Sequence, residues 1–419
     1  MTDGVASWVP VAADSPFPVQ NLPLGIGAAD DDPRAWVAIG DHALDLAAVQ
    51  DAGLLDDLDL PEACFAEDAL NSYLTTGPDA WAATRARLTD LLTDPSQASS
   101  LEPLLAQRVD LAMGLPVRVG DYVDFYSSLH HATNLGRLFR PDSEPLLPNW
   151  RRLPVGYHGR SGTIIPTERS IPRPCGLRLI DEEPTFGPTG ALDIELEVGT
   201  VVGVGSERGE PIAATAASDH LYGLCLVNDW SARDIQAYEY QPLGPFLGKS
   251  FATSVSPWLV SLEALEPYRV DPPTQEPPVA GYLRTDDPWG FDLHLEVELE
   301  SAAMHEAGTP PLTISSTSFA DMYWTPAQQL AHMTANGASV RPGDLFASGT
   351  VSGPTTGSEG SFIELTWRGE RPLDLPDGSS RAFLADGDRV TLRGWAGRND
   401  QPRIGLGEVS GTITESTKG

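Results

Sequence analysis

Acidic side chains alternate with apolar ones in two segments of this 419-residue chain. Leu192 to Val198 carries Asp193, Glu195 and Glu197 on one face of a predicted strand and apolar residues on the other. Side chains two apart on a strand point the same way and lie about 6.6 Å apart, so a pair of glutamates can reach one hard cation. Asp292 to Glu298 repeats the alternation. Each segment is therefore either a metal site or a solvated strand face, and one of them is expected to be only a solvated face.

A second group of reactive side chains lies between Asp121 and Asn134. Asp124, two tyrosines and the adjacent His130 and His131 crowd into this span. Histidine is the usual general base near neutral pH. A single histidine is also commonly structural, so the span predicts either a base or a buried structural ring.

Two further polar clusters follow apolar stretches. The run Gly223–Asn228 leads into a cluster made of Asp229, Arg233, Gln236, Tyr240, Lys249 and Thr253. Polar groups at a strand end are either a binding site or a surface salt-bridge loop. The glycine-rich segment Arg341–Gly353 precedes Glu364, which stands between apolar neighbours. Glu364 is either an exposed strand residue or a carboxylate that orients a catalytic histidine.

The elements that must position these groups are mainly short strands. Glycine (40) and proline (37) are frequent and without period, which indicates many turns. We expect a hairpin over 35–46 and strands over 192–198, 223–228, 291–299 and 389–394. Helical spacing of apolar residues predicts helices over 80–92, 101–109 and 322–336. A domain boundary is expected near residue 117.

Composition limits the possible partners. Asp and Glu number 59 against 27 Lys and Arg, a net charge of −32. Such a surface disfavours nucleic acid and anionic membranes, because phosphate binding needs cationic side chains. Three scattered cysteines indicate neither a zinc ribbon nor a disulfide framework. With no signal peptide and no long apolar run, we expect a cytoplasmic protein without a membrane span.

Stretches spread over nearly the whole chain resemble, in order, the motifs of the fumarylacetoacetase family. They are Ser15–Pro23, Asp124–Asn134, Leu147–Trp150, Leu153–Arg160, Leu192–Glu197, Asn228–Gln236, Pro242–Ser250 and Arg341–Gly353. Their number and order argue against a chance match.

The resemblance implies a mainly β fold with some α. It divides the chain into a small N-terminal SH3-like β-barrel domain, residues 1–117, and a larger C-terminal β-structured catalytic domain, residues 118–419, that forms a homodimer. The positions that match carboxylate ligands of a catalytic Ca²⁺ or Mg²⁺ are Asp124, Glu195, Glu197 and Asp229. Lys249 and Thr253 match positions linked to a further Mg²⁺. Because an ammonium cannot ligate a cation, we expect Lys249 to be a neighbouring charge.

The resemblance also implies an activity: hydrolysis of a carbon–carbon bond in the β-diketo acid 4-fumarylacetoacetate to fumarate and acetoacetate, the last step of tyrosine and phenylalanine breakdown. His131 matches the base, Glu364 its partner, and Arg233, with Lys249, a group that stabilises the leaving carbanion. Substrate-binding positions are matched by Tyr126, Arg140, Tyr157, Gln236, Tyr240 and Thr350. Two residues depart from the pattern: His130 has no counterpart, and Ala252 stands where glycine is usual.

Two alternatives differ from this interpretation. One is an acylpyruvate-type β-diketone hydrolase of the same superfamily; such enzymes are usually shorter and lack the N-terminal domain. The other is a non-catalytic, Ca²⁺-stabilised binding protein. An assay of products from fumarylacetoacetate separates all three.

Overall fold

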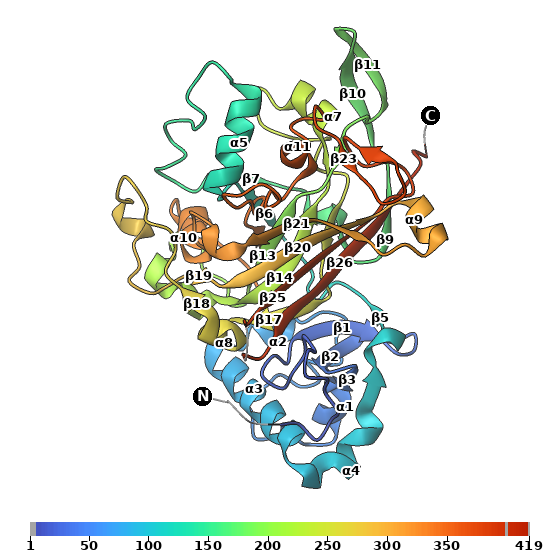
Figure 1. Cartoon of the computed structure of the whole chain (residues 1–419). Coiled ribbons are helices and arrows are strands. Elements are labelled where there is room, and N and C mark those ends of the chain that lie inside the picture. Colours follow the sequence, from blue (N-terminus) through green and yellow to red (C-terminus); the bar gives the residue numbers. More distant parts are fainter. Residues whose placement is uncertain (1–5, 399–400, 418–419) are drawn as a thin grey trace.

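A long mixed sheet forms the centre of the computed structural model, which describes residues 6–398 and 401–417 (Figure 1). Its strands follow in the order β4-β3-β2-β1-β17-β14-β13-β22-β6-β7, and β5, β8 and β16 pair beside this path. Their bounds are Leu24–Ala28 (β1), Arg34–Ile39 (β2), His42–Asp45 (β3), Leu105–Gln107 (β4), Ala112–Met113 (β5), Tyr122–Phe125 (β6), Gly156–His158 (β7), Ile164–Pro166 (β8), Leu196–Val202 (β13), Leu221–Asp229 (β14), Thr253–Val255 (β16), Trp258–Ser261 (β17) and Leu345–Ala347 (β22). The expected mainly β fold is confirmed.

The N-terminal strands join this sheet through β1, which pairs antiparallel with β17 so that Leu24 lies opposite Leu259. The predicted hairpin is confirmed, because β2 and β3 pair with Ile39 opposite His42. The helices of this part are Leu46–Asp51 (α1), Asn71–Leu74 (α2), Pro78–Thr93 (α3) and Ala98–Leu101 (α4). The helix expected over 80–92 is therefore confirmed as part of α3, whereas the SH3-like barrel stays a prediction.

The helix expected over 101–109 is wrong. The chain there ends α4, makes a 3-10 turn over Glu102–Leu104 and enters β4. Pro103 has no backbone N–H to continue an α-helix, and residues 105–107 instead pair with β3, with Gln107 opposite His42. Tertiary strand pairing thus overrides a local apolar spacing that also suits a helix.

A second sheet, in the order β21-β20-β25-β26-β9, packs against β14 of the central sheet. Leu226 of β14, Leu295 of β20 and Leu392 of β25 belong to one buried apolar core. The strands are Arg169–Pro172 (β9), Leu293–Glu300 (β20), Leu312–Ser318 (β21), Arg389–Ala396 (β25) and Ile404–Thr414 (β26). The expected strands over 291–299 and 389–394 are confirmed with small changes of bounds.

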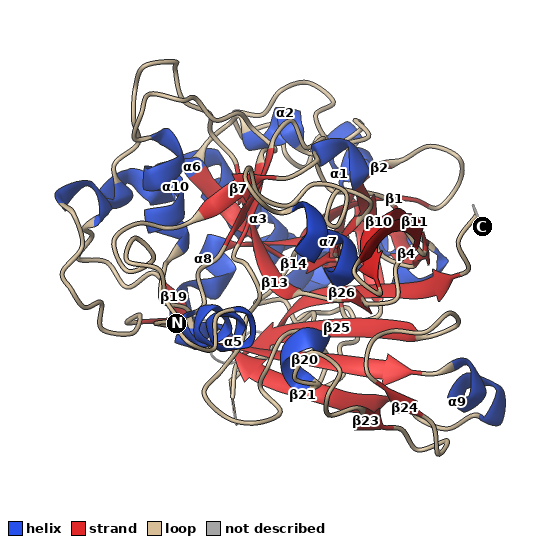
Figure 2. Cartoon of the chain, turned by 90° about the horizontal axis from the view of Figure 1, so that it is seen from above, coloured by secondary structure: helices blue, strands red, loops and turns tan. Residues whose placement is uncertain are grey.

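The remaining elements surround the two sheets (Figure 2). Short strands are Cys175–Ile180 (β10), Glu183–Pro188 (β11), Leu192–Asp193 (β12), Ser231–Ala232 (β15), Arg269–Val270 (β18), Gly290–Phe291 (β19), Leu373–Asp374 (β23) and Ser380–Arg381 (β24). Helices are Leu129–Phe139 (α5), Ala217–His220 (α6), Arg233–Glu239 (α7), Leu262–Leu265 (α8), Ala302–Ala307 (α9), Pro326–Thr334 (α10) and Phe362–Leu365 (α11). The helix expected over 322–336 is shorter because a capping box of Thr325 and Gln328 starts it at Pro326. Within the described residues, no helix combines the length and apolar content that a membrane crossing requires.

Candidate metal centre and active site

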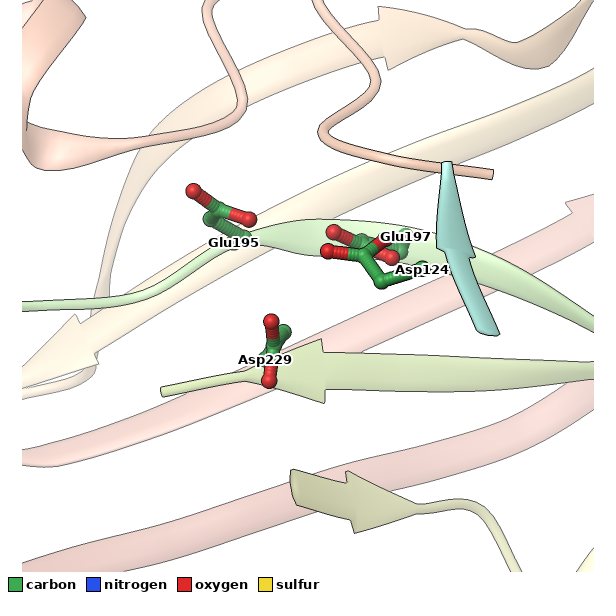
Figure 3. Close-up of side chains that lie close together, drawn as sticks. All are labelled: Asp124, Glu195, Glu197 and Asp229. Carbon is green, nitrogen blue, oxygen red and sulfur yellow. The ribbon is translucent and has the colours of Figure 1, made fainter. Parts of the chain in front are cut away.

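Four carboxylates from different parts of the central sheet meet at one point (Figure 3). Asp124 comes from β6, Glu197 from β13, Asp229 from the end of β14, and Glu195 from the segment just before β13. Strand pairing brings them together: β13 pairs antiparallel with β14, and β22 joins β13 to β6. One oxygen of each carboxylate lies within 4.8 Å of the others, and all four residues are buried.

This cluster has the properties of a cation site. Among the described residues, both carboxylate oxygens of Glu197 and Oδ1 of Asp124 are buried and have no hydrogen-bond partner. Burial, with the neighbouring carboxylates, raises the pKa of Asp124 and of Glu197 well above their usual values. Unpaired buried charge is costly. A divalent ion would supply both the missing charge and the missing partner for these oxygens, so the buried carboxylates fit a divalent metal.

Two cationic side chains flank one side of the cluster. Lys249 Nζ lies 2.5 Å from Glu195 Oε2 and 2.9 Å from Asp229 Oδ2, which agrees with its expected role as a neighbouring charge. Thr253 Oγ1 donates to Asp229 Oδ1 at 2.8 Å. Although burial acts in the opposite direction, Lys249 and Arg233 hold the pKa of Glu195 below its usual value. The four carboxylates therefore differ: Glu195 is compensated by protein cations and Glu197 is not.

A buried histidine–carboxylate pair lies beside the cluster. His131 is in the first turn of α5, which Ser128 caps by accepting from His131 N at 3.1 Å. Its Nδ1 lies 2.7 Å from Glu364 Oε2, and its ring meets that of Tyr126 edge-on with centroids 5.2 Å apart. Of the two interpretations of Glu364, the exposed strand is wrong, because Glu364 is buried in α11.

Glu364 is held by three further donors. Asn134 Nδ2 donates to Oε1 at 3.0 Å, and Ser352 Oγ and Ser361 Oγ donate to Oε2 at 3.0 and 2.7 Å. Burial raises the pKa of Glu364, but His131 and these hydrogen bonds outweigh it, so the pKa lies below its usual value. The two serines were not among the sequence candidates. The helical spacing of Asn134 from His131, three positions, is the only local signal that identifies one of the three donors.

Arg233 links the cluster to a fifth carboxylate. Its Nε donates to Asp193 Oδ2 at 2.7 Å, and its Nη1 lies 2.7 Å from Glu195 Oε1 and 3.2 Å from Gln236 Oε1. Asp193 therefore does not join the metal cluster, although the alternating pattern placed it on the same face as Glu195 and Glu197. The expected strand over 192–198 breaks after Asp193, because the N–H groups of residues 194 and 195 bond to the side chains of Asp193 and Asn228.

The other expected substrate-binding residues differ in burial and in what they contact. Tyr157 donates its hydroxyl to Asp229 Oδ2 at 3.1 Å, and Thr350 is buried with no partner for its hydroxyl within the described chain. Arg140 ends α5 and donates from Nη2 to Pro145 O at 2.7 Å, while its Nε is buried without a partner among the residues described. Tyr240 follows α7 and is half-exposed, with its hydroxyl accepting from Gln241. No contact of the described residues joins Arg140 or Tyr240 directly to the four carboxylates.

A cavity of about 170 Å³ opens beside the cluster. Its lining includes Tyr157, Asp229, Lys249 and Thr253, together with the exposed Phe246. A small polar molecule therefore has access to the side of the cluster that carries Lys249.

The second alternating segment, β20, makes no such centre. Its residues alternate between buried and half-buried, and its glutamates are paired: Glu296 with His294 at 2.9 Å and Glu298 with Arg393. The expectation that one segment is only a solvated strand face is met by β20.

Solved structures with this architecture include the fumarylacetoacetate hydrolase of Exiguobacterium antarcticum, at TM-score 0.53 and 15% identity, covering 94% of this chain and 99% of that one. A maleylpyruvate hydrolase from Sphingobium aligns with TM-score 0.51 and 13% identity, over 94% of this chain and 100% of that one. At these identities the likeness shows the fold alone.

Sequence similarity is much closer. Residues 20–116 match the family model described as fumarylacetoacetase N-terminal, and residues 122–414 match the one described as fumarylacetoacetate (FAA) hydrolase C-terminal. The fumarylacetoacetase of Arabidopsis thaliana is 45% identical over 98% of both chains, and that of Homo sapiens is 44% identical over 97% of this chain and 98% of its own. The chain therefore belongs to the fumarylacetoacetase family of hydrolases, as its motifs predicted.

Proposed function

We propose that the chain hydrolyses fumarylacetoacetate to fumarate and acetoacetate. The observation that carries the proposal is an identity of about 45% to fumarylacetoacetases over nearly the full length of both chains. In the reaction, water oxygen bonds to the carbonyl carbon of the fumaryl group, and the bond from that carbon to the neighbouring methylene breaks. The electron pair leaves on the methylene as an enolate, which takes a proton to become acetoacetate.

Asp124, Glu195, Glu197 and Asp229 would hold the divalent ion, which when bound polarises the substrate carbonyl as a Lewis acid. Carboxylate oxygens suit both Ca²⁺ and Mg²⁺. We propose one of these two ions, with Ca²⁺ favoured by a ligand set made of four carboxylates. Lys249 stays a neighbouring charge, and Thr253 orients Asp229 through its hydroxyl.

His131 is proposed as the general base. Its Nδ1 faces the Glu364 carboxylate at 2.7 Å, so Nδ1 carries the proton and Nε2 is the nitrogen that accepts one from water. Glu364, itself held by donors from Asn134, Ser352 and Ser361, fixes the ring and stabilises the imidazolium that forms. This is the role of the third member in nucleophile–base–orienter arrangements.

The departing enolate needs cationic or donor groups nearby. Arg233 and Lys249 supply charge, and Gln236 keeps Arg233 in place through its side-chain oxygen. Arg140, with Tyr126 and Tyr157, is proposed to hold the substrate's anionic end, and Tyr240 and Thr350 to line the remaining surface. The resemblance also favours a homodimer and a division of the chain near residue 117, which sedimentation and limited proteolysis test.

The deciding experiment is a product assay with two substrates. Purified protein with Ca²⁺ or Mg²⁺ is given fumarylacetoacetate or an acylpyruvate, and the products are identified by chromatography. We expect fumarate and acetoacetate in equal amounts and a higher kcat/KM for fumarylacetoacetate. A preference for the acylpyruvate, or no turnover of either compound, contradicts the proposal.

A further inference from the structure

Asp193 is a buried carboxylate that joins two halves of the site without belonging to either. Its Oδ2 accepts from Arg233 Nε at 2.7 Å. Its two oxygens also accept from the backbone N–H groups of Phe362 and Ile363, at 2.7 and 3.0 Å, and Oδ1 accepts from Ile194 N at 2.7 Å. The carboxylate is completely buried and all of these partners are protein groups. One side chain thus contacts both the arginine on the leaving-group side and the helix that carries Glu364.

Its contact with Arg233 fixes the direction of the guanidinium. Asp193 holds Nε, and Glu195 with Gln236 holds Nη1. Nη2 is left as a buried donor without a hydrogen-bond partner among the described residues. A guanidinium is a rigid planar fork, so holding two of its nitrogens determines where the third points. Nη2 is therefore the one donor of Arg233 that a substrate oxygen can use.

Its contacts with Phe362 and Ile363 fix the direction of Glu364. The helix α11 has four residues, Phe362–Leu365, and its N-cap Ser361 makes no side-chain cap bond. A helix this short is not stable alone, and the N–H groups of its first turn need outside acceptors. Asp193 supplies an acceptor for two of them, and a carboxylate at a helix N-terminus also interacts favourably with the helix dipole. Glu364 follows these two residues directly, so the orientation of its side chain toward His131 depends on this anchor.

We propose that Asp193 is a positioning residue that sets Arg233 and Glu364 in register, so that the base and the leaving-group stabiliser act on the same substrate. The inference rests on the proposed hydrolysis and adds to it a residue that touches neither metal nor substrate. It predicts that a displaced Asp193 carboxylate damages turnover more than substrate binding, because the two groups that it positions act in the chemical steps: Glu364 through the base in water attack, and Arg233 in departure of the enolate.

The chain offers a matched control. Asp388 is also a completely buried carboxylate that pairs with an arginine and a backbone N–H. Arg381 Nε and Nη2 donate to it at 2.8 and 2.9 Å, and Ala385 N donates at 2.8 Å. None of these residues belongs to the active site. Asp388→Asn therefore measures the effect of breaking such a network where no chemistry depends on it.

The experiment compares kcat, KM and melting temperature of metal-loaded full-length variants. Asp193→Asn is expected to lower kcat by about 10- to 100-fold with KM within about threefold, since small misplacements of catalytic groups cost about this much. Asp193→Glu keeps the charge but moves the carboxylate, and we expect a similar fall in kcat. This variant also covers the case in which the asparagine variant does not fold. Asp388→Asn should lower the melting temperature and leave kcat within about twofold, as expected of a purely structural pair.

Double variants distinguish positioning from general loosening. In a chain that already carries Arg233→Met or Glu364→Gln, adding Asp193→Asn should lower kcat by less than about a further threefold, because residues that act as one unit are not additive. In a Glu296→Gln background it should keep its full cost, because distant sites add. Full additivity with Arg233 and Glu364, or unchanged kcat in Asp193→Glu, overturns the inference. A crystal structure of Asp193→Asn in which Arg233 and the 2.7 Å contact of His131 with Glu364 are unchanged also overturns it, whatever the activity. Absence of turnover in the unsubstituted enzyme would instead contradict the proposed function.

Discussion

Two strands with the same alternation of acidic and apolar residues have opposite environments in this molecule. The segment that enters β13 buries Glu195 and Glu197 between neighbouring strands that bring Asp124 and Asp229 to the same point. The strand β20 leaves its glutamates partly exposed, with Glu296 paired with His294 and Glu298 with Arg393. The alternation determines that the carboxylates share a face. What covers that face decides whether it binds a metal.

The two regions also share a histidine–glutamate pair. His131 and Glu364 lie 2.7 Å apart, and their side chains are 3% and 0% exposed. His294 and Glu296 lie 2.9 Å apart, with side chains 35% and 27% exposed. The distances hardly differ, so distance does not distinguish the pair proposed to be catalytic from the other one. Burial does, because water screens the outer pair and excluding water strengthens the electrostatic interactions of the inner one.

The sharpest test of this comparison is removal of the metal. Chelation is expected to abolish turnover, because the unpaired buried oxygens of Asp124 and Glu197 would then have no compensating cation and the carbonyl would have no Lewis acid. Glu197→Gln should weaken metal binding by at least about tenfold, or 1.4 kcal/mol, because one anionic ligand becomes neutral. Isothermal titration calorimetry with Ca²⁺ and with Mg²⁺ measures the metal affinity of Glu197→Gln and of the unsubstituted protein.

The control is Glu296→Gln on β20, which removes the same charge from the same residue type. Its metal affinity and turnover should equal those of the unsubstituted protein. Full activity after chelation would show that turnover needs no metal. A larger loss of metal affinity in Glu296→Gln than in Glu197→Gln would show that the metal site has been assigned to the wrong strand.

The second test concerns the buried pair of His131 and Glu364. His131→Ala should lower kcat by about 10²- to 10⁴-fold, the usual contribution of a general base, with metal affinity unchanged. Glu364→Gln should cost less, and the two together much less than the product of the single effects. Steady-state kinetics and metal titration measure these variants.

The matched variants are His294→Ala and His130→Ala. Both changes should have mild effects on kcat. His294 lies on the second sheet, where it pairs with Glu296, and it is His131, not His130, that contacts Glu364. If His130→Ala is the more damaging change, or if the effects of His131→Ala and Glu364→Gln simply multiply, the buried pair is not the acid–base unit.

Much of this arrangement could be predicted from the sequence, for reasons that differ between residues. The alternation around Glu195 and Glu197 indicated a shared face, but Asp124 and Asp229 lie on other strands and were identified through family motifs. The same alternation does not indicate that Asp193 stays outside the metal cluster and pairs with Arg233, because the strand breaks at residues 194 and 195, where side-chain acceptors replace strand pairing. A local pattern cannot contain that information.

The same limit explains the other differences. Residues 101–109 have helical spacing, yet Pro103 and pairing with β3 make residues 105–107 a strand. Ser352 and Ser361 reach Glu364 from a loop and a helix cap, and hydroxyls of this kind have no pattern in sequence. Elements with strong periodicity, such as α3 and β20, were predicted well because their own side chains determine them.

The smallest expected effect concerns two arginines, Arg140 at the end of α5 and Arg393 on β25 of the second sheet. Arg140 has a buried Nε without a partner among the described residues, so its guanidinium retains donors for a substrate carboxylate. Lysine cannot copy the fork geometry that binds a carboxylate through two nitrogens. Arg140→Lys should therefore raise KM by about tenfold, equal to 1.4 kcal/mol, and lower kcat by less than about threefold.

Arg393→Lys is the control, since Arg393 already pairs with Glu298 and Glu408 on the second sheet. Such half-exposed ion pairs contribute about 0 to 1 kcal/mol to stability, so KM should not change there. An unchanged KM in Arg140→Lys, or an equal rise in both variants, would mean that the substrate's anionic end is bound elsewhere.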